Sequence, residues 1–172
     1  RESRAWAEID LDALAHNYHA LRDWIQASSA PGAPVALLGM VKANAYGHGA
    51  PAIGRKLQEL GADMLAVACL AEAAELREAG ITIPILCLGQ TPVEQAEDLL
   101  AYDVTQTVGD LEIGRALSAA SVAAGKELAI HIKLDTGMGR LGFIWREGSQ
   151  AGTVVQVRAL CALPGLRAEG LF

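Results

Sequence analysis

The spacing of apolar positions changes repeatedly along the chain and predicts alternating helices and strands. Apolar residues at every third or fourth position predict an amphipathic helix over about 12–27. An uninterrupted apolar run over 35–41 is instead typical of a strand that is covered on both faces. The same contrast continues to the end of the chain. Further strands are expected at 64–68, 83–88, 104–108, 128–134 and 167–172. Further helices are expected in the segment that ends at Gly61, at 71–79, at 91–101, from Asp110 to about 124, and at 149–163.

Residues that begin and end helices support several of these boundaries. Asp110 is placed to cap the helix that follows it, because its carboxylate can accept from free amides of the first turn. Thr91 and Glu94, with proline between them, have the spacing of a capping box. Gly80 and Gly125 stand where a helix is expected to end.

Six apolar strands that alternate with helices predict an α/β fold with a parallel sheet. An open doubly wound sheet and an incomplete (β/α)8 TIM barrel, with about six of its eight strands, both fit this count. Neither GxGxxG nor GxxxxGK[ST] follows the first strand, so the nucleotide-binding signatures of doubly wound sheets give that alternative no support.

Composition narrows the classes of protein further. The 172 residues include 14 basic and 20 acidic side chains, and a net charge of −6 argues against binding to nucleic acid or to an anionic membrane surface. A mean hydropathy of +0.25 excludes a disordered chain, and the apolar runs are too short to cross a bilayer. The three cysteines lack metal-ligand spacing, so we expect no metal site and a reducing, cytoplasmic location. Cys69 and Cys87 lie in apolar runs and are expected to be core residues.

The densest polar segment directly follows the first long apolar strand and runs from Lys42 to Gly49 (KANAYGHG). In parallel α/β folds, groups at the carboxyl ends of the strands face the active site. A lysine that leaves an apolar strand there is partly desolvated, which favours the neutral amine that Schiff-base chemistry requires. The alternatives are a lysine that reaches solvent from the strand end, a packed Tyr46 and a structural His48.

A second polar segment covers residues 131–142. His131, Lys133 and Asp135 alternate, so along one continuous strand their side chains would share a face. Three ionisable groups on one strand face must pair with one another or line a site. The glycines of this segment let the chain turn back and place Arg140 over the strand end, where a guanidinium can hold a carboxylate or phenolate. An ion-pair network that only stabilises the fold is the alternative.

Three blocks of the chain resemble bacterial alanine racemases. Residues 4–11 (RAWAEIDL) resemble the opening of those enzymes, and residues 41–49 (VKANAYGHG) resemble their pyridoxal-phosphate signature. Residues 133–142 (KLDTGMGRLG) resemble a third block of the family. The resemblance is in register over nearly the whole chain. It implies a fold-type III pyridoxal-phosphate enzyme whose N-terminal domain is a (β/α)8 barrel.

Position by position, the resemblance implies a role for four residues. Lys42 would form the Schiff base with pyridoxal 5′-phosphate and act as the base for the D-enantiomer. Tyr46 would hydrogen-bond the cofactor phosphate, and Arg140 would bind the cofactor's phenolic oxygen and help to orient the substrate carboxylate. Lys133 would be carbamylated to N6-carboxylysine, because an unmodified lysine would repel Arg140 whereas the carbamate would hold it.

The resemblance also implies the interconversion of L-alanine and D-alanine for peptidoglycan synthesis. We expect residues 1–172 to be part of the barrel domain, with a C-terminal β-domain after residue 172. A homodimer is expected, because the family's second base is a tyrosine of that β-domain in the other subunit, and this segment alone is then inactive. The alternatives are a serine racemase of the vancomycin-resistance type, a non-catalytic pyridoxal-phosphate-binding barrel, and a βα fragment without a cofactor.

Overall fold

One parallel sheet organises the molecule. The computed structural model describes residues 5–30, 32 and 34–172, and Arg4, the first residue of the RAWAEIDL block, lies outside them. Within the described residues the sheet has six strands in the order β1-β2-β3-β4-β5-β8. Their bounds are β1 Leu38–Met40, β2 Met64–Val67, β3 Ile85–Cys87, β4 Val104–Val108, β5 Leu128–Ile132 and β8 Leu166–Leu171. Each strand therefore lies beside the one that precedes it in this sheet.

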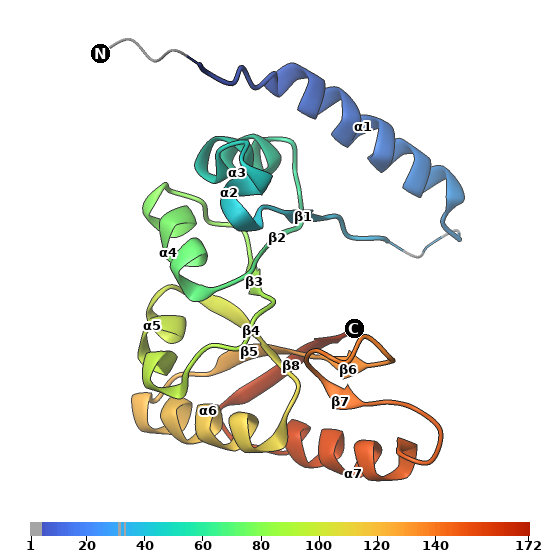
Figure 1. The fold of residues 1–172 in the computed structure, drawn as a ribbon, viewed down its shortest axis with the longest axis vertical. Coiled ribbons are helices and arrows are strands. Elements are labelled where there is room, and N and C mark those ends of the chain that lie inside the picture. The colour runs from blue at the N-terminus through green and yellow to red at the C-terminus, as the bar shows by residue number, and fades with distance from the viewer. Residues whose placement is uncertain (1–4, 31, 33) are drawn as a thin grey trace.

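This sequential order decides between the two folds that the strand count allows. A doubly wound sheet reverses its strand order at a switch point, whereas a β/α barrel adds each strand beside the last. The order seen here has no reversal, so the sheet is part of a barrel. Figure 1 shows the strands stepping in a curved row from β1 to β8.

Helices connect the strands and cover the outer side of this row. They are α1 Leu11–Ser28, α2 Lys42–Tyr46, α3 Ala50–Glu59, α4 Leu70–Glu78, α5 Ala96–Ala101, α6 Leu111–Ala124 and α7 Gln150–Cys161. In Figure 1, α4 and α5 flank the strands, α6 and α7 lie below them, and α1 stands at the opposite end beyond β1. The core lies between strands and helices, where alternate strand residues such as Leu65, Ile85 and Ile130 are fully buried.

Polar contacts hold α1 to the first βα unit. The Arg22 guanidinium bonds the Asp63 carboxylate at 3.0 Å and the carbonyl of Gly61 at 2.8 Å. Asp63 also accepts the backbone N–H of Leu37 at 2.7 Å. This last bond, together with Arg22, lowers the pKa of the Asp63 carboxyl.

The predicted ends of α6 are confirmed. The Asp110 carboxylate accepts from the backbone N–H groups of Glu112 and Ile113 at 2.8 and 3.1 Å, and Gly125 ends the helix with φ +63°. The predicted capping box at Thr91 is wrong. The Thr91 hydroxyl is buried and donates to the side-chain oxygen of Gln106 at 2.6 Å, so it does not cap the following turn.

Two predicted strands differ in length from the structure. The run 35–41 forms a strand only over β1, and the run 128–134 stops at Ile132, where β5 ends. The chain then forms a separate two-stranded sheet from β6 (Leu134–Asp135) and β7 (Phe143–Ile144), within a segment that the sequence indicates as a loop. The glycines between β6 and β7 allow this close return of the backbone.

The cysteines divide between core and surface. Cys87 is buried as predicted, but the prediction for Cys69 is wrong, because that residue is exposed where the chain leaves β2 and enters α4. Among the described residues, no group of three or more His, Cys, Asp or Glu side chains has the arrangement of a metal site. Within the same residues, none of the helices combines the length and apolarity needed to span a membrane.

Candidate active site

Lys42 stands where β1 ends at the carboxyl edge of the sheet. The preceding residue, Val41, is 0% exposed and its backbone N–H donates to the carbonyl of Ala66 in β2, so the chain is anchored up to this point. Lys42 itself is half-buried, and its Nζ lies 6.0 Å from the centre of the Tyr46 ring. Tyr46 is 60% exposed and is therefore not the packed core residue that one alternative proposed.

A left-handed turn connects these two side chains. The four residues 43–46 have φ between 51° and 55°, although none of them is glycine. L-residues avoid this region because the side chain approaches the backbone too closely, at roughly 1–2 kcal/mol per residue. Local bonds close the turn, including Ala45 N–H to Val41 O at 2.8 Å and Ala50 N–H to the Asn44 side chain at 2.7 Å. His48 is structural, as one alternative held, since its Nδ1 lies 2.7 Å from the carbonyl of Ala45.

Arg140 lies on the loop between β6 and β7. The Asp135 carboxylate shapes this loop by accepting the backbone N–H groups of Gly137 and Gly139 at 3.0 and 2.9 Å. These bonds lower the pKa of Asp135, with a smaller contribution from the Lys133 charge. Gly142 is required at the end of the loop, because a Cβ there would lie 2.7 Å from the backbone nitrogen of Asp135.

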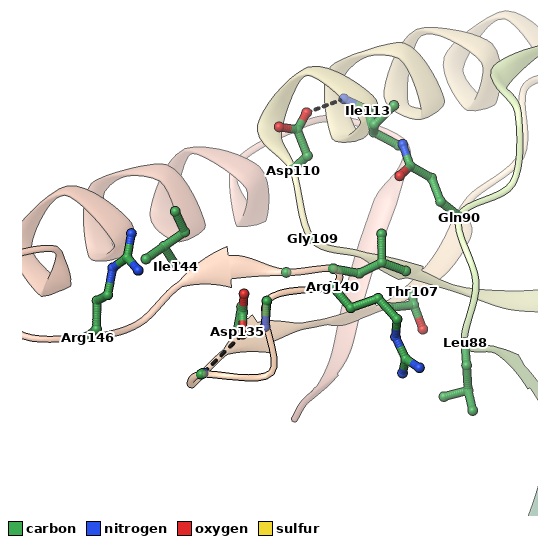
Figure 2. Close-up of a pocket in the computed structure, with 14 residues that line it drawn as sticks. Leu88, Gln90, Thr107, Gly109, Asp110, Ile113, Asp135, Arg140, Ile144 and Arg146 are labelled. Carbon is green, nitrogen blue, oxygen red and sulfur yellow. Dashed lines mark hydrogen bonds between the residues drawn. The ribbon is translucent and has the colours of Figure 1, made fainter.

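Figure 2 shows Arg140 in a pocket of about 490 Å³ whose wall includes Leu88, Thr107 and Arg146. The Arg140 side chain is exposed, and its guanidinium has no ion-pair partner within the described residues. Thr107 is 5% exposed, and its hydroxyl finds no hydrogen-bond partner in the described part of the chain. A buried, unpaired hydroxyl beside a free guanidinium suits a polar ligand atom that would bond both. Sequence reasoning missed Thr107, because the polar residues of its strand, VTQTV, match no motif.

The second polar segment does not form the single row that its alternation predicts. β5 ends before Lys133, and Asp135 belongs to β6 with its carboxylate turned into its own loop. Lys133 Nζ instead lies 4.8 Å from the centre of the Phe172 ring. The ring centres of His131 and Phe172 are 6.5 Å apart. Burial lowers the pKa of His131. Among the described residues the ion pairs include none of these side chains, so the internal ion-pair network is not formed.

The structure places the predicted site residues on one edge of one sheet, in two groups. Lys42 and Tyr46 follow β1, whereas Lys133 and Arg140 follow β5. Three strands separate β1 from β5, and Lys42 does not line the pocket of Arg140. Both groups nevertheless lie at the carboxyl ends of parallel strands, which is the end where β/α barrels carry their active sites.

These features define a barrel domain with a lysine held by a strained turn at the carboxyl edge of its sheet. A family model described as alanine racemase, N-terminal domain, matches residues 9–172. The chain belongs to this family.

Similar proteins agree in sequence and in fold. The alanine racemases of Clostridium perfringens (strain SM101 / Type A) and Desulforamulus reducens are 46% and 42% identical over 167 residues, which is 97% of this chain. The solved alanine racemase of Clostridium difficile 630 is 37% identical, with a TM-score of 0.88 over 100% of this chain and 43% of its own. A histidine racemase from Leuconostoc mesenteroides is 25% identical, with a TM-score of 0.80 over 94% of this chain and 40% of its own. The chain spans about 40% of the length of the two curated relatives.

Proposed function

We propose that this chain is the cofactor-binding barrel segment of an alanine racemase, an enzyme that interconverts L-alanine and D-alanine with pyridoxal 5′-phosphate. The observation that carries the proposal is Lys42, a half-buried primary amine fixed by a strained turn at the carboxyl edge of the sheet. The relatives that are named alanine racemases support the substrate class.

The residues present fit the cofactor chemically. Pyridoxal 5′-phosphate carries an aldehyde, a phosphate and a phenolic oxygen, and the edge offers an amine, a phenol and a guanidinium as partners. The unpaired Thr107 hydroxyl adds a buried polar group next to Arg140. We therefore assign Lys42 to the aldehyde, the exposed Tyr46 hydroxyl to the phosphate, and Arg140 to the phenolic oxygen and the substrate carboxylate.

When bound, the cofactor supplies an electron sink that makes the α-proton of an amino acid acidic. The chain's own residues then bind and orient the substrate and move its α-proton. Lys42 Nζ takes the α-proton from one face of the substrate or returns it there, and its fixed turn keeps the amine at that face. Arg140 binds the substrate carboxylate by charge-assisted hydrogen bonding and so helps to orient the substrate. Racemisation needs a second base on the opposite face, which we assign to a tyrosine of the other subunit of a homodimer.

Carbamylation of Lys133 to N6-carboxylysine belongs to the same proposal. The amine lies against the Phe172 ring and has no ion-pair partner within the described residues. Converting it to a carbamate would replace a positive charge by an acceptor that an arginine can bond. Because a carbamate is lost in acid and on unfolding, carbon-13 NMR of the folded protein in carbon-13-labelled bicarbonate tests this step. A spectrum in which the unaltered protein shows no carbamate signal beyond that of Lys133→Arg would contradict it.

The experiment uses the full-length protein loaded with pyridoxal 5′-phosphate. Chiral chromatography measures D-alanine formed from L-alanine, and proton NMR in deuterium oxide measures exchange at the α-carbon. We expect Lys42→Ala to abolish both, whereas Lys126→Ala, at the amino-terminal side of β5, serves as a control that leaves both unchanged. Racemisation that survives Lys42→Ala would refute the proposal.

The same assay addresses the alternatives. A non-catalytic barrel would take up the cofactor but show no exchange, and a serine racemase would turn over L-serine faster than L-alanine. A histidine racemase with a similar half-barrel fits the proposal that the substrate side chain is selected outside these residues. Alanine is therefore proposed from the named relatives, together with a cytoplasmic role in supplying D-alanine to peptidoglycan.

A further inference from the structure

Glu72, on α4, contacts the loop that follows Lys42. One oxygen of its carboxylate, Oε1, accepts the backbone N–H of Ala43 at 2.7 Å. The other oxygen, Oε2, accepts the backbone N–H of Ala68 at 2.7 Å. A single carboxylate thus joins the two loops that leave β1 and β2 at the carboxyl edge of the sheet.

The bond to Ala43 reaches a strained part of the backbone. Ala43 follows Lys42 and is the first of the four residues with positive φ. At roughly 1–2 kcal/mol for each residue, the left-handed turn costs about 4–8 kcal/mol, which its surroundings must offset. Within the described residues, the Ala43–Glu72 bond is the only hydrogen bond that 43–46 make to a residue outside 41–50.

Helix capping alone does not explain this arrangement. An acidic side chain in the first turn of α4 stabilises the helix through its dipole, and the bond from Ala68 N–H is a local capping contact. That role needs one oxygen. The second oxygen extends to a residue 29 positions earlier, so it acts on the turn rather than on the helix.

We infer that Glu72 is a positioning residue, whose carboxylate holds the Ala43 amide and so fixes the direction in which Lys42 and Tyr46 leave the sheet. The inference rests on the proposed function, because it holds that Glu72 orients Lys42 so that the amine can approach the cofactor aldehyde. A charged acceptor bonds a backbone N–H more strongly than a neutral one does. The side chain can therefore contribute part of what offsets the turn.

The first measurement needs no cofactor. Hydrogen exchange of the backbone amides, followed by mass spectrometry on the unloaded full-length protein, compares Glu72→Ala with Glu75→Ala. Glu75 is an exposed carboxylate on the same helix, so it controls for the loss of charge from α4. We expect amides 43–47 to exchange about tenfold faster in Glu72→Ala, the factor that the loss of one charge-assisted hydrogen bond allows, and to be unchanged in Glu75→Ala.

The second measurement follows attachment at Lys42. The unloaded protein is mixed with pyridoxal 5′-phosphate, borohydride stops the reaction at fixed times, and mass spectrometry quantifies the labelled Lys42 peptide. We expect labelling to be about tenfold slower in Glu72→Ala than in Glu75→Ala, by the same hydrogen-bond argument. Should Glu72→Ala fail to fold, Glu72→Gln replaces it, because the amide is neutral and has one acceptor oxygen where Glu72 uses two.

A double variant separates positioning from general support. Ala43 is exposed, so Ala43→Gly removes little packing, and glycine adopts positive φ without the steric cost of alanine. In the Glu72→Ala background, Ala43→Gly should restore at least about threefold of the lost labelling rate, because it removes part of the strain that Glu72 offsets. A role limited to the stability of α4 would give no such rescue.

The outcomes distinguish the two proposals. If the unaltered protein carries no trapped cofactor on Lys42, the proposed function is refuted. If the unaltered protein is labelled while Glu72→Ala matches Glu75→Ala in both labelling and exchange, the positioning role alone is overturned. Slower labelling that Ala43→Gly fails to restore also overturns it.

Discussion

Arg77 allows a stability prediction whose magnitude can be worked out bond by bond. Its guanidinium, on α4, donates to four backbone carbonyls in the loops that precede β3 and β4. The acceptors are Ile81 at 2.9 Å, Ile83 at 2.7 Å, Tyr102 at 2.8 Å and Asp103 at 2.9 Å. The first three bonds are partly buried. Burial lowers the pKa of the guanidinium, which means that the charge is partly desolvated there.

The expected loss follows from these bonds. Three partly buried hydrogen bonds at about 1 kcal/mol each, with little from the exposed fourth, give about 3 kcal/mol. Arg77→Met keeps the packing of the stem and removes the cost of desolvating the charge, so we expect the free energy of unfolding to fall by about 2–3 kcal/mol. Arg77→Lys should lose most of the same amount, because one ammonium cannot reach four carbonyls that a planar fork bonds.

Urea unfolding followed by far-UV circular dichroism measures these changes. Arg55→Met is the matched control, since Arg55 is exposed and makes one bond, of 3.2 Å, to the carbonyl of Ala79. That variant should change the free energy by less than about 0.5 kcal/mol. The reasoning is refuted if Arg77→Met stays within about 0.5 kcal/mol of the unaltered protein, or if Arg77→Lys retains full stability.

Three further predictions follow from the loops and the thiols. In Gly142→Ala the new Cβ would meet the backbone of β6, so hydrogen exchange over 134–144 should accelerate. Gly152→Ala, in α7, where a Cβ meets open space and φ is not positive, should leave that loop unaffected. The folded-state pKa of Asp135 lies below its usual 3.8, so its carboxylate stabilises the fold above pH 3.8 and loses that effect as the pH falls through the lowered value. Melting temperatures of the unaltered protein and Asp135→Asn should therefore differ most near pH 7 and converge at lower pH; a constant difference would contradict this sign. Burial raises the pKa of the Cys87 thiol, so iodoacetamide at pH 8 should label Cys69 but leave Cys87 unlabelled until the protein unfolds.

Local signals predict those parts of the fold in which neighbours along the chain decide the structure. Asp110 and Gly125 mark the ends of α6 because capping needs only residues of the same turn. The Thr91 prediction fails because a buried neighbour competes for the hydroxyl. Gln106, from β4, accepts that hydrogen bond, and no spacing rule within 91–94 contains this information.

The site divides in the same way. The end of the first strand and its lysine follow from an apolar run and the polar segment after it, so Lys42 is correctly placed at the carboxyl edge of the sheet. The left-handed backbone of 43–46 does not follow, because of its four residues only Asn44 is of a type that tolerates positive φ, and the two alanines and Tyr46 avoid it. Part of its support comes from Glu72 on another element, and a hydrogen bond across 29 residues cannot be predicted from the spacing of residues.

Lys42 and Arg140, the two parts of the candidate site, are therefore held in place by different interactions. The backbone after Lys42 is set by a turn that costs about 4–8 kcal/mol, closed by its own amides and by Glu72, so the fold fixes the base of this side chain before a ligand binds. Arg140 is exposed on a loop that its own Asp135 shapes, and its guanidinium has no ion-pair partner in the part of the chain that the structure describes. Under the proposed function, its final position comes from the anionic group that it binds. This arrangement suits the proposed function, because the Lys42 side chain must return to the same position in every catalytic cycle, whereas a free guanidinium can adjust to each acid that it binds.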